Sequence, residues 1–210
     1  MKEVSLFKKT NIIQVSCGIG KSFEEATNAL LKAKKNKGKV YYNIQIYKGK
    51  ILRSKIPEGF KVRAKNFLRL AKKLSQEERK ILEEVSLRDP ITGMYNKTGF
   101  VIKLEALRKE KRDLGYYMLF DLDDLHYWNH KIGYSKVDKY IEVIGKVIAG
   151  NVRHNRGEDI VAHRLNESAG DEFLVFTPSK FGEEASEKIK LVAKRLINKI
   201  YGVQKNIKII

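Results

Sequence analysis

The sequence predicts an α+β fold, in which an antiparallel sheet of the ferredoxin-like, split βαβ type carries helices on one face. Two observations predict it. Short apolar runs alternate with stretches whose apolar residues recur every three or four positions, and from residue 115 onward their order is β-α-β-β-α-β. The predicted strands are 115–121, 159–164, 172–177 and 206–210, and the predicted helices between them are 135–150 and 183–201.

The strand predicted over residues 115–121 is a nearly continuous apolar run, which is typical of a buried strand. A helix with one apolar face is predicted over 97–112, before this strand. In a split βαβ sheet the first and third strands lie side by side in the middle of the sheet. We therefore expect 115–121 and 172–177 to pair in antiparallel orientation.

The first half of the chain predicts a different organisation. A strand over 11–16 leads into a helix over 22–36, and residues 39–47 and 51–56 predict a β-hairpin. Residues 60–87 predict two helices or one imperfect one. An apolar stripe in this stretch comprises Phe67, Leu70, Leu74, Ile81 and Val85. The expected domains are a basic α/β module over 1–59, a helical linker over 60–87 and an α+β domain over 88–210.

Charge is unevenly distributed along the 210 residues, which carry a formal net charge of +18. Residues 1–85 contain 21 Lys or Arg and 8 Asp or Glu, a net of +13. A basic module favours nucleic acid, a nucleotide or another anionic surface as a partner. Lysine-rich solvated surface without a partner explains the charge equally well.

Several classes of protein are excluded or disfavoured. No apolar run approaches 18 residues, and the N-terminus has no signal-peptide pattern, so we expect a cytoplasmic protein without a membrane span. Cys17 is the only cysteine, which excludes intramolecular disulfides and cysteine zinc sites. Gly20-Lys21-Ser22 resembles the end of a phosphate-binding P-loop, but Val15 stands where that motif needs a glycine. His126 and His130 alone do not make a zinc site.

Acidic residues follow one predicted strand and open another. Asp121 and Asp123 close the strand over 115–121, and Asp171 and Glu172 open the strand over 172–177. Because these strands are expected to pair antiparallel, the two acidic pairs should meet. Clustered carboxylates repel each other and commonly hold a hard divalent cation. The pattern favours a palm-type site, in which Mg²⁺ aligns a triphosphate and activates a hydroxyl; two exposed acidic turns are the alternative.

Three blocks make the chain recognisable. RDPITGMYNKTGF (88–100), LFDLDDLHYWNHKIGYSKVD (119–138) and SAGDEFLVF (168–176) resemble the GGDEF domain of diguanylate cyclases, in the same order and spacing. The resemblance covers about residues 86–210 and implies a palm of the nucleotidyl cyclase type. It says nothing about residues 1–85.

The resemblance implies roles for individual residues. Asp121 and Asp171 would bind Mg²⁺ or Mn²⁺, together with the backbone carbonyl of Leu122, and Asp171 and Glu172 would be catalytic. Asn129 and Asp138 would read guanine, because an amide and a carboxylate complement its polar edge. The remaining implied positions are Ala169, Gly170 and His126 for substrate binding, and Arg156 and Asp159 for inhibitory binding of cyclic di-GMP.

The chain also departs from the family pattern. Ala169 replaces the first glycine of the signature, His126 stands where a lysine is usual, and Leu165–Ser168 lengthen the preceding hairpin. The family continues beyond the last predicted strand into a helix whose lysine and arginine contact the triphosphate, whereas this sequence ends at Ile210. Cations from the basic N-terminal region could replace them in space.

Three functions are therefore compatible with the sequence. The first is a Mg²⁺-dependent homodimeric enzyme that condenses two GTP into cyclic di-GMP. The second is an inactive GGDEF-type sensor of GTP or cyclic di-GMP, which Ala169 and the shortened C-terminus favour. The third is a nucleic-acid-associated protein that binds phosphates through residues 1–59, and its affinity should then fall steeply with salt.

Overall fold

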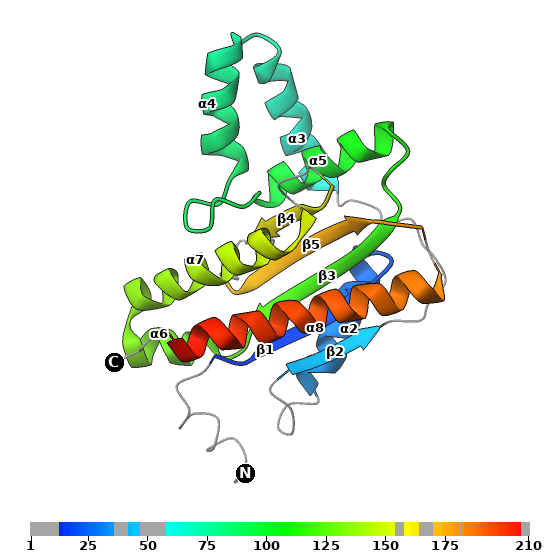
Figure 1. Cartoon of the computed structure of the whole chain (residues 1–210). Coiled ribbons are helices and arrows are strands. Elements are labelled where there is room, and N and C mark those ends of the chain that lie inside the picture. Colours follow the sequence, from blue (N-terminus) through cyan, green and yellow to red (C-terminus); the bar gives the residue numbers. More distant parts are fainter. Residues whose placement is uncertain are drawn as a thin grey trace.

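The protein is built around one five-stranded sheet (Figure 1). The computed structural model describes residues 13–35, 42–46, 58–153, 158–163, 170–180 and 182–206. The strands lie in the order β2-β1-β3-β5-β4, and all neighbours are antiparallel except the parallel pair β1 and β2. Their bounds are β1 Val15–Gly20, β2 Tyr42–Ile46, β3 Gly115–Leu122, β4 Ile160–His163 and β5 Glu172–Pro178.

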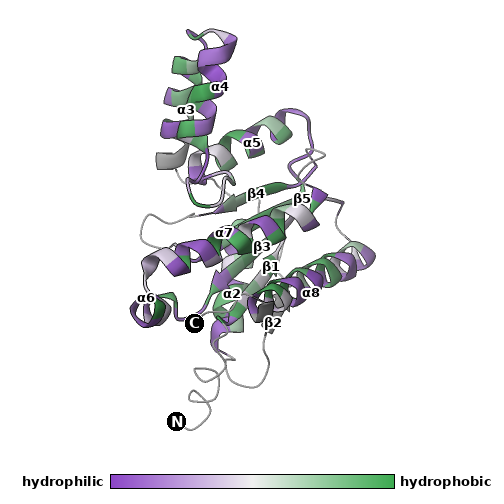
Figure 2. Cartoon of the chain, turned by 60° about the vertical axis from the view of Figure 1, so that its left-hand side comes forward, coloured by the Kyte–Doolittle hydropathy of each residue, from purple (hydrophilic) through white to green (hydrophobic). Residues whose placement is uncertain are grey.

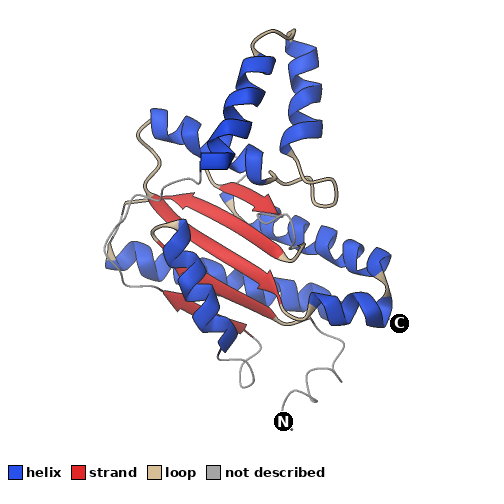
Figure 3. Ribbon diagram, turned by 180° about the vertical axis from the view of Figure 1, so that it is seen from behind, coloured by secondary structure: helices blue, strands red, loops and turns tan. Residues whose placement is uncertain are grey.

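Helices cover both faces of the sheet, whereas the sequence predicted one face. The helices α7 and α8 lie on the face seen in Figure 1, and α2 and α5 lie on the face seen from behind in Figure 3. Apolar side chains alternate along the strands and feed a separate core on each face. The helices are α2 Phe23–Lys35, α3 Glu58–Ala71, α4 Gln76–Leu87, α5 Lys97–Lys109, α6 Leu125–Ile132, α7 Tyr134–Asn151 and α8 Glu183–Asn206.

The centre of the sheet agrees with the expected split βαβ arrangement. The strands β3 and β5 pair antiparallel, with Phe120 opposite Phe173 and Asp121 opposite Glu172. All eight residues of β3 are buried, as its apolar sequence predicted. The prediction that the first and third strands of the palm are neighbours is therefore confirmed.

Two strands from the N-terminal region, predicted as a basic module over 1–59, belong to this sheet. The strand β1 pairs with β3, so this N-terminal strand belongs to the same sheet as the palm strands. It is also shifted from the predicted 11–16 to Val15–Gly20. The chain returns through α2 to the parallel strand β2, as in a βαβ unit. The partner strand of the predicted hairpin, 51–56, lies outside the described residues, and the domain boundaries at 59 and 87 stay predictions.

Two glycines allow α2 to lie directly on β1. A Cβ atom on Gly18 would overlap the backbone of Ala26 and Leu30, and one on Gly20 would overlap the backbone of Glu25 and Ala26. Side chains at these strand positions would therefore push the helix off the sheet. Small residues on α2, including Ala26, are correspondingly buried.

The strand β1 lies beside β3, on the side away from β5. The helix predicted over 183–201 continues as α8 to Asn206, and the rest of the predicted strand 206–210 lies outside the described residues. The end of α8 contacts the start of β1 directly. The Gln204 side chain accepts a hydrogen bond from the Ile13 amide at 2.8 Å and donates one to the Ile13 carbonyl at 3.1 Å. The Tyr201 hydroxyl accepts from the Val15 amide at 2.9 Å.

The stretch predicted as a linker forms two helices that extend away from the sheet (Figure 2). Ser75 begins α4 with a capping box, in which Ser75 and Glu78 satisfy each other's backbone amides. The predicted apolar stripe is only partly buried. Phe67 packs against Leu87, but Ile81 and Val85 are 65% and 77% exposed. No helix in the described part of the chain is long and apolar enough to cross a membrane.

Candidate active site

The carboxyl end of β3 and the start of β5 bring the predicted acidic residues together. Asp121 lies opposite Glu172, and the Leu122 amide donates a hydrogen bond to the Asp171 carbonyl at 3.1 Å. Asp121 and Leu122 are 2% and 1% exposed, and Asp171 is partly exposed. The antiparallel register therefore places two of the predicted metal ligands on adjacent strands at one end of the sheet.

A lysine from the N-terminal region contacts this acidic end. Lys34 Nζ lies 2.7 Å from Asp121 Oδ1. Burial, assisted by the charges of Asp171 and Asp123, raises the pKa of Asp121 to about 6, although the ion pair with Lys34 opposes the rise. Lys34 from the N-terminal region therefore lies at the acidic end of the sheet. That N-terminal cations replace those expected to contact the triphosphate stays a prediction.

The neighbouring carboxylate, Asp123, is held by β1. Ser16 donates its hydroxyl proton to Asp123 Oδ2 at 2.9 Å, and the Asp123 amide donates to the Gln14 carbonyl at 2.8 Å. Asp123 is 2% exposed. A buried carboxylate that accepts hydrogen bonds in this way has a structural role in joining β1 to the end of β3.

The donor atoms at this end suit a hard divalent cation. Asp171 Oδ1 is buried and accepts no hydrogen bond within the described residues. Carboxylate and carbonyl oxygens are the ligands that Mg²⁺ prefers, and Mg²⁺ commonly uses only one or two carboxylates together with substrate phosphates. The described residues contain no group of three His, Cys, Asp or Glu side chains able to hold a metal. Such a site would therefore depend on Asp121, Asp171 and the nucleotide's own phosphates.

A buried histidine, which the sequence did not single out, holds the turn before Asp171. His163 is fully buried, and its Nε2 lies 3.1 Å from the Gly170 carbonyl. Its Nδ1 lies 3.1 Å from Asp89 Oδ1. The same carboxylate oxygen accepts hydrogen bonds from the amide and the hydroxyl of Thr92. Asp89 and Thr92 belong to the first block of the resemblance, so His163 connects that block to the signature.

Acid should weaken this connection. Burial alone would raise the pKa of Asp89, but His163 and Thr92 outweigh it and lower the pKa to about 2. Because the folded pKa lies below the ordinary value of 3.8, the carboxylate stabilises the fold above pH 4, and this contribution of about 2 kcal/mol is lost as the pH falls through 2. Chemical denaturation between pH 5 and pH 2 should show a steeper loss of stability for the natural chain than for Asp89→Asn. An equal pH dependence of stability in the two proteins would contradict a stabilising role of the Asp89 carboxylate.

The predicted guanine-reading residues lie on two consecutive helices. Asn129 is on α6 and Asp138 is on α7, and both are partly exposed. Gly133, with a φ of 88°, joins the helices, and its amide donates to the Asn129 carbonyl at 3.0 Å. His126 is exposed on α6, where its ring packs edge-on against His130. The roles of Asn129, Asp138 and His126 stay predictions.

The predicted inhibitory site is only partly described. Asp159 is 6% exposed, accepts a hydrogen bond from the Arg153 amide at 2.8 Å and pairs with the Arg153 guanidinium at 3.1 Å. Arg156 lies outside the described residues, as does Ala169, which was predicted to bind substrate. Among the described residues, Asp159 therefore contacts Arg153, a residue that the sequence had not singled out.

The sequence Gly20-Lys21-Ser22 begins a helix, which agrees with the rejection of a P-loop. Ser22 Oγ accepts a hydrogen bond from the Glu25 amide at 3.1 Å. Glu25 in turn accepts from the Lys21 amide at 2.8 Å. The local backbone donors are thus used within the helix start.

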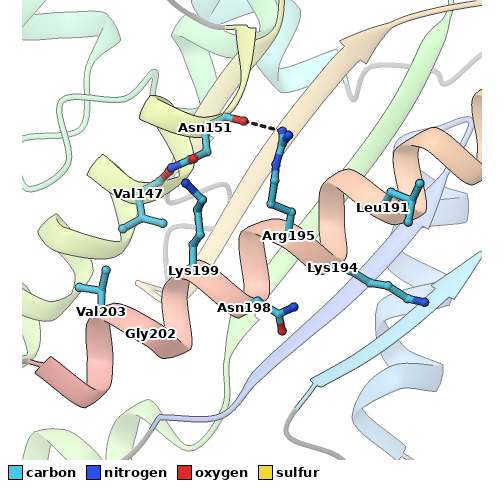
Figure 4. Close-up of a pocket in the computed structure, with 9 residues that line it drawn as sticks. All are labelled: Val147, Asn151, Leu191, Lys194, Arg195, Asn198, Lys199, Gly202 and Val203. Atoms are coloured by element: carbon cyan, nitrogen blue, oxygen red, sulfur yellow. Dashed lines mark hydrogen bonds between the residues drawn. The ribbon is translucent and has the colours of Figure 1, made fainter.

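A groove with a volume of about 760 Å³ lies between α7 and α8, away from these residues (Figure 4). Arg195 and Lys199 extend from α8 toward α7, and Arg195 donates to the Asn151 carbonyl at 3.0 Å. Lys194 also lines the groove. None of the predicted site residues lines the groove.

Comparison with known proteins decides the family. The family model "Diguanylate cyclase, GGDEF domain" matches residues 86–208, more than half of the chain. The chain belongs to the GGDEF family. The match begins at the end of α4, and it includes Asp121, Asp171 and the helices that carry Asn129 and Asp138. No curated protein matches the chain.

Solved structures of GGDEF proteins are similar to this chain. The diguanylate cyclase SiaD from Pseudomonas aeruginosa, in complex with its activator SiaC, is 23% identical over 66% of this chain, with a TM-score of 0.41. The coiled coil and GGDEF domain of DgcB from Caulobacter crescentus, in complex with c-di-GMP, is 16% identical over 64% of this chain, with a TM-score of 0.43. This GGDEF protein covers 52% of the SiaD chain and 68% of the DgcB chain.

Proposed function

We propose that this GGDEF protein is a diguanylate cyclase that requires Mg²⁺ or Mn²⁺ and condenses two GTP into cyclic di-GMP. The observation that carries the proposal is the β3–β5 register, which brings Asp121 and Asp171 to one end of the sheet. Asp171 Oδ1 is buried and has no hydrogen-bond partner among the described residues, which supports a cation at this place.

Each predicted residue then has a chemical task. Asp121, Asp171 and the Leu122 carbonyl hold the cation, which when bound supplies Lewis-acid stabilisation of phosphate charge. Asn129 and Asp138 orient the guanine from the α6–α7 pair. Gly170, Ala169 and His126 would contribute to substrate binding, and Glu172 would be catalytic together with Asp171.

The reaction uses two half-sites, which a homodimer supplies. The 3′-hydroxyl of each GTP attacks the α-phosphate of the other. Two new P–O bonds form, two bonds to the β-phosphates break, and two pyrophosphates and two hydroxyl protons leave. The task of each subunit is to position one GTP so that its hydroxyl faces the other's α-phosphate.

The test is incubation of the purified chain with GTP and Mg²⁺, followed by chromatographic separation and mass spectrometry. The proposal predicts cyclic di-GMP and two equivalents of pyrophosphate, with loss of product when a chelator removes the metal. Absence of product at high protein concentration would contradict it.

A sensor that binds GTP or cyclic di-GMP without turnover is the second candidate. The ion pair between Lys34 and Asp121 favours it, because a cation already neutralises one of the two metal carboxylates. Calorimetry distinguishes the candidates, since a sensor should bind the nucleotide with no product formed. Nucleic-acid binding through residues 1–59 stays a prediction, tested by the salt dependence of affinity.

A further inference from the structure

The N-terminal strand occupies a specific position in the palm. In a split βαβ sheet the fourth strand follows the second helix and pairs with the first strand. Here α8 is the second helix and β3 is the first strand, and β1 fills the place beside β3. The hydrogen bonds of Gln204 with Ile13 hold the end of α8 beside the start of β1. A loop from the second helix to the fourth strand would bring the same two ends together.

The helix after this strand brings one cation to the acidic end of the sheet. The antiparallel pair places Ser16 of β1 opposite Asp121 of β3. The chain passes along β1, turns at Ser22 and runs back through α2, so that Lys34 near the end of α2 returns to the level of Asp121. Gly18 fixes this placement by letting α2 lie on the strand.

The contact made by Lys34 is a short ion pair with a buried partner. Its Nζ lies 2.7 Å from Asp121 Oδ1, and the side chains of Lys34 and Asp121 are 34% and 3% exposed. Burial would lower the pKa of Lys34, but the Asp121 hydrogen bond and the charges of Asp121, Asp123 and Asp171 raise it. The ammonium group is therefore a fixed positive charge held by the carboxylates expected to bind metal.

We propose that β1 and α2 are the fourth strand and following helix of the palm, carried at the front of the chain, and that Lys34 is a resident cation that competes with the divalent metal for Asp121. This inference rests on the proposed function. Lys34 keeps Asp121 ordered and neutralised before nucleotide arrives. When a metal ion binds with the nucleotide, Lys34 leaves Asp121 and its partly exposed ammonium becomes available to the nucleotide's phosphates.

Competition follows from charge and geometry. A metal at about 2.1 Å from an Asp121 oxygen would lie close to the ammonium that Oδ1 accepts from at 2.7 Å, and two cations so close together repel strongly. Without Lys34, metal binding no longer meets this repulsion. A charge-assisted hydrogen bond of ordinary strength corresponds to about a tenfold change in affinity.

The experiment is a titration of the nucleotide-free chain with Mn²⁺, followed by electron paramagnetic resonance of the free ion. We expect Lys34→Gln to bind Mn²⁺ about tenfold more tightly than the natural chain. Lys35→Gln, which removes an exposed lysine next to it, should leave the affinity unchanged. Lys34→Arg keeps the charge and should not tighten binding. If Lys34→Gln unfolds more easily, Mn²⁺ should restore its stability more than that of the natural chain.

The amine itself provides a second readout. Lys34 should react faster with an amine-directed reagent after Mn²⁺ alone is added, whereas Lys35 should not change. Equal or weaker Mn²⁺ affinity of Lys34→Gln would overturn the competition and leave the proposed function standing. If neither the natural chain nor the variant binds Mn²⁺, with or without nucleotide, the metal site and the proposed function both fall.

Discussion

Replacing Asp171 with Asn should reduce cyclic di-GMP formation by at least about 100-fold. The change preserves the size of the side chain but removes the charge at Oδ1, the buried oxygen without a hydrogen-bond partner in the described part of the chain. A metal ion supplies several kcal/mol of stabilisation to developing phosphate charge, and each 1.36 kcal/mol corresponds to a tenfold change in rate. Initial rates of product formation at saturating Mg²⁺ and GTP measure the effect.

Asp113→Asn is the matched control, because Asp113 forms an exposed ion pair with Arg108 on the surface. It should retain the natural rate, since such pairs contribute little. Both variants should give the natural circular dichroism spectrum. A natural rate in Asp171→Asn would show that Asp171 does not hold the catalytic metal.

Replacing Gly18 with Ala should destabilise the whole domain by about 3 kcal/mol. The added Cβ overlaps backbone atoms of Ala26 and Leu30, which cannot move as the end of a flexible side chain can. Because β1 lies between β2 and β3, displacement of α2 also disturbs the inner sheet. Urea denaturation measures the free energy of unfolding.

Gly150→Ala provides the control for this substitution. Gly150 lies in α7, and a Cβ there would meet nothing within 4 Å. It should stabilise the protein by about 0.5–1 kcal/mol, because alanine is the better helix former. If Gly18→Ala were equally harmless, α2 would not be packed on β1 as described.

The sequence predicted the centre of the fold and the acidic end of the sheet well. Strands β3 and β5 have strong local signals, since their apolar runs are long and acidic residues follow or precede them. Their antiparallel pairing, which brings Asp121 to Asp171, followed from the split βαβ order alone. These are the features that local periodicity and connection rules determine.

The N-terminal part could not be predicted in this way, because its position depends on pairing with residues about 100 positions away. The strand prediction over 11–16 gave equal weight to residues before Val15 and missed Cys17–Gly20, whose two glycines weaken a strand signal. The contact of Lys34 with Asp121 depends on this long-range pairing. His163 was missed because a single histidine in an apolar strand carries no motif.

In the proposed site, residues 13–35 lie against the carboxylates of β3 and β5 that hold the metal. Mn²⁺ broadens the amide resonances of nearby residues, so ¹⁵N-labelled protein titrated with Mn²⁺ and a non-hydrolysable GTP analogue tests it directly. The amides of Asp121, Leu122 and Asp171 should broaden first, together with those of Ser16 and Lys34 from the other end of the chain. Broadening that spares residues 13–35, or that centres away from Asp121 and Asp171, would contradict this account.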